Sequence, residues 1–389
     1  MPSIRAFCVA AALLSPTALA EEVPVWFGNN TKPKTASEGI YVAKFDTVTG
    51  AITKPVLAGV AKNPTFLAFH PRLPVLYATS EITGADGKPA GAVEAFAIDE
   101  ATGSLESRGA ESTGGTGPCH VTVDREGKVV LAANYSGGNV ACLGLAEDGR
   151  LKPLASADGA GGFVQHDYDR AGEEGINPKR QDKPHAHSVD VSPDGTIVVV
   201  CDLGLDRVFL HGLDRERATL APRRSAKLKT GAGPRHFALH PDGHRAWCVN
   251  ELDLTVTAFT YDAARGELRA GETVSTLPPS VTDRTGFSCA EIAVHPNGKF
   301  LYASNRGHDS IVMFRIVGDT NTLEFLGVEP TLAKTPRHFA IAPGGKFLLA
   351  GGQASNNVTV FAIDDETGRL TFMGTSVEVP SPMCVAFRP

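Results

Sequence analysis

Histidine, arginine and glutamate recur at matching places along this 389-residue chain. The stretch 184–187, Pro-His-Ala-His, precedes an apolar alternation that ends in a turn at Asp194-Gly195. The stretches 234–236 and 336–338, both Pro-Arg-His, precede similar alternations. Histidine and glutamate can transfer protons, and arginine can hold an anion through its planar fork. The recurrence predicts one structural position at which both kinds of chemistry are available.

An internal repeat fixes where these residues lie in each unit. Aligned on the residue that begins each inner apolar alternation, the units follow one another about 50 residues apart. The seven anchors are Phe66, His120, His187, His236, Glu291, His338 and Cys384. Turn pairs such as Asp242-Gly243 follow most anchors and indicate hairpins, because these turns require a positive φ. Four short strands per unit predict an all-β, seven-bladed β-propeller with four-stranded blades.

The two ends of the chain predict how the ring closes. The last unit stops after one strand at 384–387, and the N-terminal part supplies three strand-like runs at 23–28, 40–45 and 52–56. We therefore expect the seventh blade to be shared between the N- and C-termini, which leaves no free sheet edge. Residues 21–389 are expected to form this single domain.

Hairpin geometry predicts which residues share a face. Each second strand returns toward the anchor of its unit, so anchors and second-strand ends should lie together. The candidates at this face are His120, Asn134, His185, His187, Arg235, Glu251, Glu291, Arg306, His308 and Arg337. Residues that break the repeat, such as the glutamate anchor and the charges after the recurring asparagine, are the stronger functional candidates. The alternative is structural, since repeated histidines can bond a neighbouring blade and charges can pair between blades.

One unit is longer than the others because of an insertion at 155–183, which is rich in Gly, Asp and Glu. Long loops in compact folds are usually functional or disordered. This insertion leads directly into His185 and His187, so we expect it on the candidate face.

The N-terminus and the composition bear on the cellular location of the protein, on its partners and on the state of its cysteines. Residues 1–20 combine Arg5, an apolar run and Ala18-Leu19-Ala20, which is typical of a signal peptide cleaved after Ala20 and predicts a periplasmic or secreted protein. No later run is long enough for a membrane span. A formal net charge of −6 without a basic run argues against nucleic acid. Six of the seven cysteines follow the leader at apolar strand positions, which indicates buried free thiols.

Signatures of several other enzyme classes are missing from the sequence. It contains no G-x-S-x-G, no H-E-x-x-H and no P-loop. A metal ion bound by His185, His187 and a carboxylate is conceivable, but the arginines expected at the same place argue against a cation. We expect neither a metal nor a cofactor.

Short segments in order along nearly the whole mature chain carry a family resemblance. They include 117–120 (Gly-Pro-Cys-His), 177–181 (Asn-Pro-Lys-Arg-Gln), 184–189 (Pro-His-Ala-His-Ser-Val), 233–236 (Gly-Pro-Arg-His) and 304–310 (Ser-Asn-Arg-Gly-His-Asp-Ser). With these segments the chain resembles the seven-bladed propeller lactonases, which include propeller-type 6-phosphogluconolactonases and fungal 3-carboxy-cis,cis-muconate lactonising enzymes. The resemblance implies a metal-independent lactone site in a propeller.

By local motif, the family's proposed His, Arg, Glu and Arg carry over to His187, Arg235, Glu251 and Arg306. In an exported lactone hydrolase, Glu251 or His187 would activate water, one arginine would stabilise the oxyanion and the other would hold a substrate carboxylate or phosphate. The remaining candidates would bind the substrate, a small-molecule lactone of the sugar or carboxylated type. We expect a monomer.

Two alternatives remain open, lactonisation of an unsaturated diacid and non-catalytic binding of a ligand or protein. Because 6-phosphogluconolactone belongs to cytosolic sugar metabolism, the expected export leaves the physiological lactone open.

Overall fold

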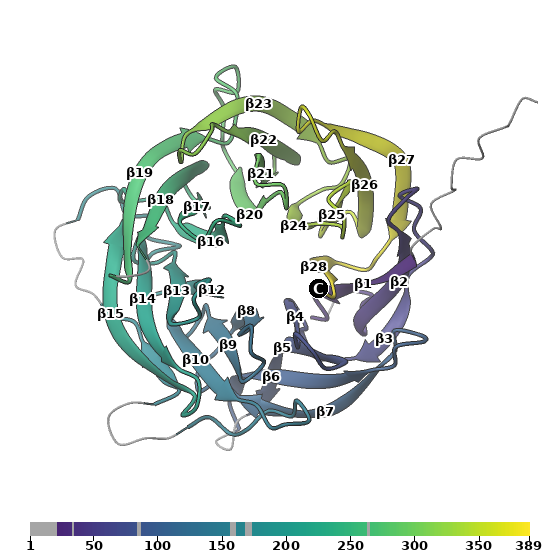
Figure 1. The fold of residues 1–389 in the computed structure, drawn as a ribbon, viewed down its shortest axis with the longest axis vertical. Helices are drawn as coiled ribbons and strands as arrows, with labels where there is room; N and C mark the ends of the chain where they lie inside the picture. The colour runs from purple at the N-terminus through teal and green to yellow at the C-terminus, as the bar shows by residue number, and fades with distance from the viewer. Residues whose placement is uncertain (1–21, 33–34, 84–86, 156–160, 168–172, 263–264) are drawn as a thin grey trace, which may run out of the picture.

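The computed structural model describes residues 22–32, 35–83, 87–155, 161–167, 173–262 and 265–389. The described chain forms 28 strands in seven four-stranded antiparallel sheets. Figure 1 shows these sheets as the blades of a closed ring around a central opening, with the innermost strands beside it. The predicted signal peptide, residues 1–20, lies outside the described residues.

The first four blades follow one another along the chain. Blade 1 contains β4 (Leu67–Phe69), β5 (Val75–Thr83), β6 (Pro89–Ile98) and β7 (Leu105–Ser112). Blade 2 contains β8 (Pro118–Val123), β9 (Val129–Asn134), β10 (Asn139–Gly144) and β11 (Phe163–Gln165). Blade 3 contains β12 (Ala186–Val191), β13 (Ile197–Asp202), β14 (Arg207–Asp214) and β15 (Thr219–Lys227). Blade 4 contains β16 (Pro234–Leu239), β17 (Arg245–Asn250), β18 (Thr255–Asp262) and β19 (Glu267–Ser275).

The last three blades complete the ring and confirm the predicted closure. Blade 5 contains β20 (Ser288–Val294), β21 (Phe300–Arg306), β22 (Ser310–Ile316) and β23 (Leu323–Pro330). Blade 6 contains β24 (Pro336–Ile341), β25 (Phe347–Gly352), β26 (Asn357–Ile363) and β27 (Leu370–Glu378). Blade 7 contains β28 (Pro382–Phe387), β1 (Glu22–Asn29), β2 (Gly39–Asp46) and β3 (Val56–Val60). Because β28 pairs with β1, the two ends of the chain share one sheet.

Burial across a blade explains the strand composition. Second strands such as β9 and β13 are buried along their whole length, because neighbouring blades pack on both of their faces. The outermost strand β7 is exposed at most positions and is correspondingly polar. Each hydrophobic cluster joins two blades; one holds Trp247 of blade 4 against Phe314 of blade 5. The core is therefore a series of interfaces between blades.

Turn chemistry sets the hairpins, as the sequence predicts. Gly243 and Gly298 occupy the inner turns with φ of 77° and 72°. On the same face, histidines latch adjacent blades: His295 accepts a hydrogen bond from Asn297 N–H at Nδ1 and donates from Nε2 to the carbonyl oxygen of Gly345 at 2.8 Å. The bond at Nδ1 orients the ring within blade 5, and the bond from Nε2 ties blade 5 to blade 6.

Two sequence-based strand positions need correction. The outer strand of blade 7 is Val56–Val60 rather than 52–56, and Ile52 forms only an isolated bridge with Phe45. Pro55 has no N–H and cannot donate to a ladder, so regular pairing begins after it. The insertion at 155–183 also contains β11, which pairs with β10 as the outer strand of blade 2. Only the chain beyond β11 is additional to the blade.

Candidate active site

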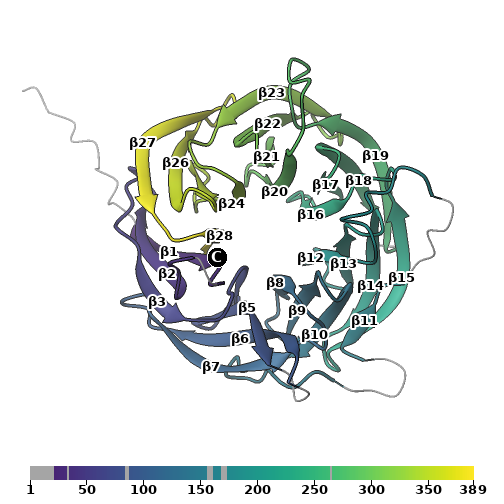
Figure 2. The same cartoon turned by 180° about the vertical axis from the view of Figure 1, so that it is seen from behind.

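A cavity of about 440 Å³ lies at the face where the inner strands begin and the second strands end. Every blade contributes to its wall, as the predicted hairpin geometry requires. The lining residues are Asn30, Lys32, Asn63, Thr65, Glu81, Gly117, Pro118, Cys119, Tyr135, Ser136, Arg180, His187, Glu251, Arg306, Arg337 and Met383. The central opening around which these residues are arranged is visible from both sides of the ring (Figures 1 and 2). The cavity thus brings together segments far apart in the sequence.

Glu251 is the charge centre of this site. It follows the last residue of β17 and is 1% exposed, and three guanidinium groups converge on its carboxylate. Oε2 accepts a hydrogen bond from Arg235 Nε at 3.0 Å and forms an ion pair with Arg306 Nη2 at 3.0 Å, and Oε1 accepts from Arg180 Nη2 at 2.5 Å. Although burial raises the pKa of Glu251, Arg306, Arg235 and Arg180 together lower it from 4.5 to about 2. Glu251 is therefore ionised at neutral pH and is a poor proton acceptor.

His187 lies beside this carboxylate on β12 and lines the cavity. Its Nε2 is 3.9 Å from Glu251 Oε2, and its Nδ1 is 3.9 Å from Cys119 Sγ. Burial and, next, the charge of Arg235 hold the pKa of His187 well below its usual 6.5. The imidazole is therefore neutral near pH 7, with a lone pair available to accept a proton.

Arg235 lies behind the cavity wall. It lines a small void of about 10 Å³ together with His236 and Arg337, and it is not among the residues around the larger cavity. Its Nη1 donates to the carbonyl oxygen of Ala290 at 2.7 Å and to His236 Nε2 at 3.1 Å. These bonds, with the one to Glu251, fix the guanidinium in place.

The anchor glutamate Glu291 supports Arg235 from a deeper layer. Because His236 Nε2 accepts from an arginine, its proton is on Nδ1, which donates to Glu291 Oε2 at 2.9 Å. His338 accepts from Val385 N–H at Nδ1 and lies 3.2 Å from the same oxygen through Nε2. Glu291 thus joins two anchor histidines and does not line the cavity.

The insertion contributes Arg180, which the sequence reasoning did not select. Its guanidinium reaches from the insertion to Glu251 of blade 4 and also donates to the hydroxyl of Tyr135. The next residue, Gln181, is buried and donates to the carbonyl oxygen of Leu203 and to Asp206, which fixes the insertion to the turn between β13 and β14 of blade 3. Arg180 lies within one of the segments that resemble the lactonases, and that was the only available signal.

The other predicted residues lie near the cavity without lining it. His185 stacks on Tyr135, donates from Nδ1 to the Tyr135 carbonyl oxygen, and pairs with Asp182. His120 accepts the N–H of Val189 in the next blade. Two further residues have contacts of their own: Asn134 bonds Thr113 and Asn139, and His308 bonds Ser310.

Cys119 and Tyr135 complete the wall next to His187. Burial raises the pKa of the Cys119 thiol to about 12, so it is a weak nucleophile at neutral pH. All six cysteines in the described chain are free, and five are buried, as their apolar settings predict. The Tyr135 ring meets His187 edge-on at 5.3 Å between centroids and restricts its orientation.

The arrangement suits proton transfer and anion stabilisation rather than metal binding. In the described part of the chain, no group of three or more His, Cys, Asp or Glu side chains is placed to hold a metal ion. None of the described segments forms a helix long and apolar enough to cross a bilayer. A neutral imidazole beside several guanidinium groups can instead activate water and stabilise an oxyanion.

Comparison with known proteins agrees with this chemistry. Residues 24–387 match the family described as "Lactonase, 7-bladed beta-propeller". The chain is 36% identical over 357 residues to the 6-phosphogluconolactonase of Bacillus subtilis, covering 92% of this chain and 96% of that one. The solved structure of a periplasmic gluconolactonase from Pseudomonas aeruginosa is similar with a TM-score of 0.83 and 30% identity, covering 95% and 99% of the two chains. A putative 6-phosphogluconolactonase from Bacteroides uniformis gives a TM-score of 0.83 at 32% identity, covering 94% and 99%. The chain therefore belongs to the seven-bladed β-propeller lactonase family and is a lactone hydrolase.

Proposed function

We propose that this lactonase opens the ring of a sugar-acid lactone, with His187 as the general base. The observation that carries the proposal is the position of the neutral His187 imidazole, which lines the cavity 3.9 Å from the arginine-bound Glu251. Amide and hydroxyl side chains such as Asn63, Thr65 and Ser136 in the same wall suit a polyhydroxylated substrate. Relatives named 6-phosphogluconolactonase and periplasmic gluconolactonase support the sugar-acid class.

The reaction needs one proton acceptor and one oxyanion partner. A water oxygen bonds to the lactone carbonyl carbon while its proton passes to His187. The carbonyl oxygen becomes an oxyanion, which Arg306 stabilises from the cavity wall. When the intermediate collapses, the ring C–O bond breaks and His187 returns the proton to the leaving ring oxygen, which yields the open hydroxy acid.

Glu251 acts electrostatically in this scheme. Its carboxylate is already engaged by three arginines, whereas the His187 imidazole is neutral and lines the cavity, so of the two candidates from the sequence we assign the base role to the histidine. Glu251 holds Arg306 in position and lies close enough to His187 to stabilise the imidazolium that forms during the reaction.

Replacing His187 tests the proposal. His187→Gln should lower kcat for glucono-δ-lactone by about 10²- to 10⁴-fold with little change in KM, after subtraction of spontaneous hydrolysis. His244→Gln, which alters an exposed histidine on the opposite face, is the matched control. The wild-type protein should lose kcat/KM only below pH 6.5, and His187→Gln should lack this acid limb. Retention of more than a tenth of the wild-type kcat would place the base elsewhere.

We also propose that the protein is exported and begins at Glu21 after cleavage. The support is the leader pattern at 1–20, and the solved Pseudomonas aeruginosa relative is named as periplasmic. Mass spectrometry of the N-terminus after expression in a bacterium with a secretory apparatus tests this. An uncut chain recovered from the cytoplasm would contradict it.

A further inference from the structure

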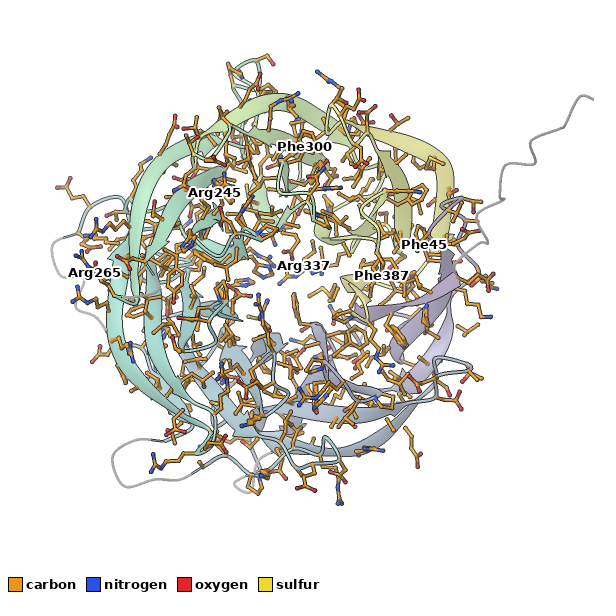
Figure 3. All side chains as sticks on the ribbon, viewed as in Figure 1. Phe45, Arg245, Arg265, Phe300, Arg337 and Phe387 are labelled. Atoms are coloured by element: carbon orange, nitrogen blue, oxygen red, sulfur yellow. The ribbon has the colours of Figure 1, made fainter. Side chains whose placement is uncertain are left out.

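Arg337 is a half-buried cation that forms no ion pair within the described chain. Its guanidinium lines both the large cavity and the small void behind it. Figure 3 labels it beside the central opening of the ring. No hydrogen-bond or ion-pair partner meets it anywhere in the described chain. A charge left unpaired in such a place is costly unless a ligand compensates for it.

The repeat explains why Arg337 is unpaired while Arg235 is not. Both follow a proline at the start of an inner strand, and in each blade that proline pairs with the last residue of the second strand, Asn250 or Gly352. The residue that comes next is Glu251 in blade 4, and it binds Arg235. In blade 6 the corresponding residue is Gln353, which carries no charge. The same backbone position thus gives one neutralised arginine and one free arginine.

The carboxylates of the cavity wall are already engaged elsewhere. Glu251 forms ion pairs with three other arginines, and Glu81 lies 3.4 Å from Lys32 Nζ. The wall therefore carries more positive than negative charge. An arginine fork in this setting matches a carboxylate or phosphate, which it can bind through two parallel hydrogen bonds.

We propose that Arg337 binds an anionic substituent of the substrate, a carboxylate or a phosphate, and makes the cavity selective for acidic lactones over neutral ones. This inference rests on the proposed lactonase function. It assigns the anion-binding role to Arg337, whereas Arg235, the equivalent arginine in blade 4, is fixed behind the wall by Glu251, His236 and Ala290.

Binding an anion at Arg337 would also strengthen the general base. Arg337 is one of the charges that hold the pKa of His187 below its usual range. An anion that neutralises this charge raises the pKa of His187 toward its usual value and makes the imidazole a better proton acceptor. Acidic substrates would thereby gain in the chemical step as well as in binding.

The test compares Arg337→Met with wild type on two lactones, 6-phosphoglucono-δ-lactone and neutral glucono-δ-lactone, with a carboxylated glucarolactone as a third arm. We expect kcat/KM for the acidic lactones to fall about 10- to 100-fold, as for loss of a charged hydrogen bond, and that for the neutral lactone to stay within about threefold. Relative losses on phosphate and carboxylate substrates identify the preferred anion. Arg224→Met, which removes an exposed guanidinium from β15, is the control for net charge.

A second measurement does not depend on turnover. Inorganic phosphate binding by calorimetry should weaken by a similar factor in Arg337→Met, and the variant should melt no lower than wild type because it loses an unpaired, half-buried charge. If no lactone is opened but phosphate binding still depends on Arg337, the proposed function fails and the anion site stands. Equal losses on neutral and acidic lactones, or unchanged phosphate binding, would overturn the anion-binding role.

Discussion

Removing the charge of Glu251 should destabilise the protein and should do so in a pH-dependent way. In Glu251→Gln the side chain keeps its size, but Arg235 and Arg306 lose their buried counterion, and the amide group faces the Arg180 donor. Breaking a buried ion pair by removing one partner typically costs about 3–5 kcal/mol. Arg180 is 38% exposed and regains water, so we expect the lower end of this range, about 3 kcal/mol.

The pKa of Glu251 gives the same magnitude independently. A shift from 4.5 to about 2 corresponds to about 3 kcal/mol of stability, at 1.36 kcal/mol for each pKa unit. Because the folded-state pKa is depressed, this stability is fully present above pH 4.5 and is lost as the pH falls toward 2. The difference in unfolding free energy between wild type and Glu251→Gln should therefore be about 3 kcal/mol at pH 7 and should largely disappear by pH 2.

Urea unfolding of both proteins between pH 7 and pH 2, followed by tryptophan fluorescence and circular dichroism, measures this difference. The comparison cancels the other carboxylates, which titrate in both proteins. Equal stability at pH 7, or a difference that does not change with pH, would refute the assignment of Glu251 as the buried counterion. Loss of the acid limb of kcat/KM in Glu251→Gln would instead identify Glu251 as the general base.

Three further predictions concern the ring and its turns. Deleting residues 382–389 removes β28 and leaves β1 without its inner partner, so the chain should fail to form a cooperatively melting ring. Deleting only residues 388–389 should be tolerated. A cooperative thermal unfolding transition of the longer deletion would contradict closure through β28. His295→Ala leaves the Gly345 carbonyl unpaired and should lower the free energy of unfolding in urea by about 2 kcal/mol. The same change at the exposed His244 should lower it by less than about 0.5 kcal/mol. Equal losses would argue against a stabilising His295–Gly345 hydrogen bond. Gly368→Ala and Gly374→Ala both place alanine at a φ near +70°, but only the first places a Cβ 2.3 Å from Phe300. The unfolding free energy of Gly368→Ala should therefore be lower than that of Gly374→Ala by about 1–3 kcal/mol. Similar melting temperatures of the two variants would contradict this.

The blades could be predicted because their signals are local. Alternating apolar residues and Asp-Gly or Asn-Gly turns act over a few residues, and their repetition identifies the propeller, its seven blades and the shared closing sheet. The prediction of strand positions failed at 52–56 and within 155–183, where the observed strands are short. Pro55 delays the pairing of β3, and β11 is a three-residue strand that only β10 defines.

The direction of the hairpin strands predicted which face of the ring carries the candidate residues. It could not predict which of them line the cavity and which lie behind its wall. Arg235 and Arg337 are equivalent in the repeat, and Glu251 and Arg306 both follow a recurring asparagine. The ion pairs of these residues depend on which charged side chains the neighbouring blades place beside them, and on Arg180 of the insertion, which pairs with Glu251. No local sequence pattern predicts these contacts between blades.

The sequence by itself thus determined the ring, the face and the residue types available for chemistry, because strand periodicity and turn conformation are properties of short segments. Only the tertiary structure decided how the charges pair. In the folded ring Glu251 forms ion pairs with three arginines, Arg235 lies behind the cavity wall, and Arg337 faces the cavity. Electrostatic energies depend on distances and burial between blades, and these are set only when the ring closes.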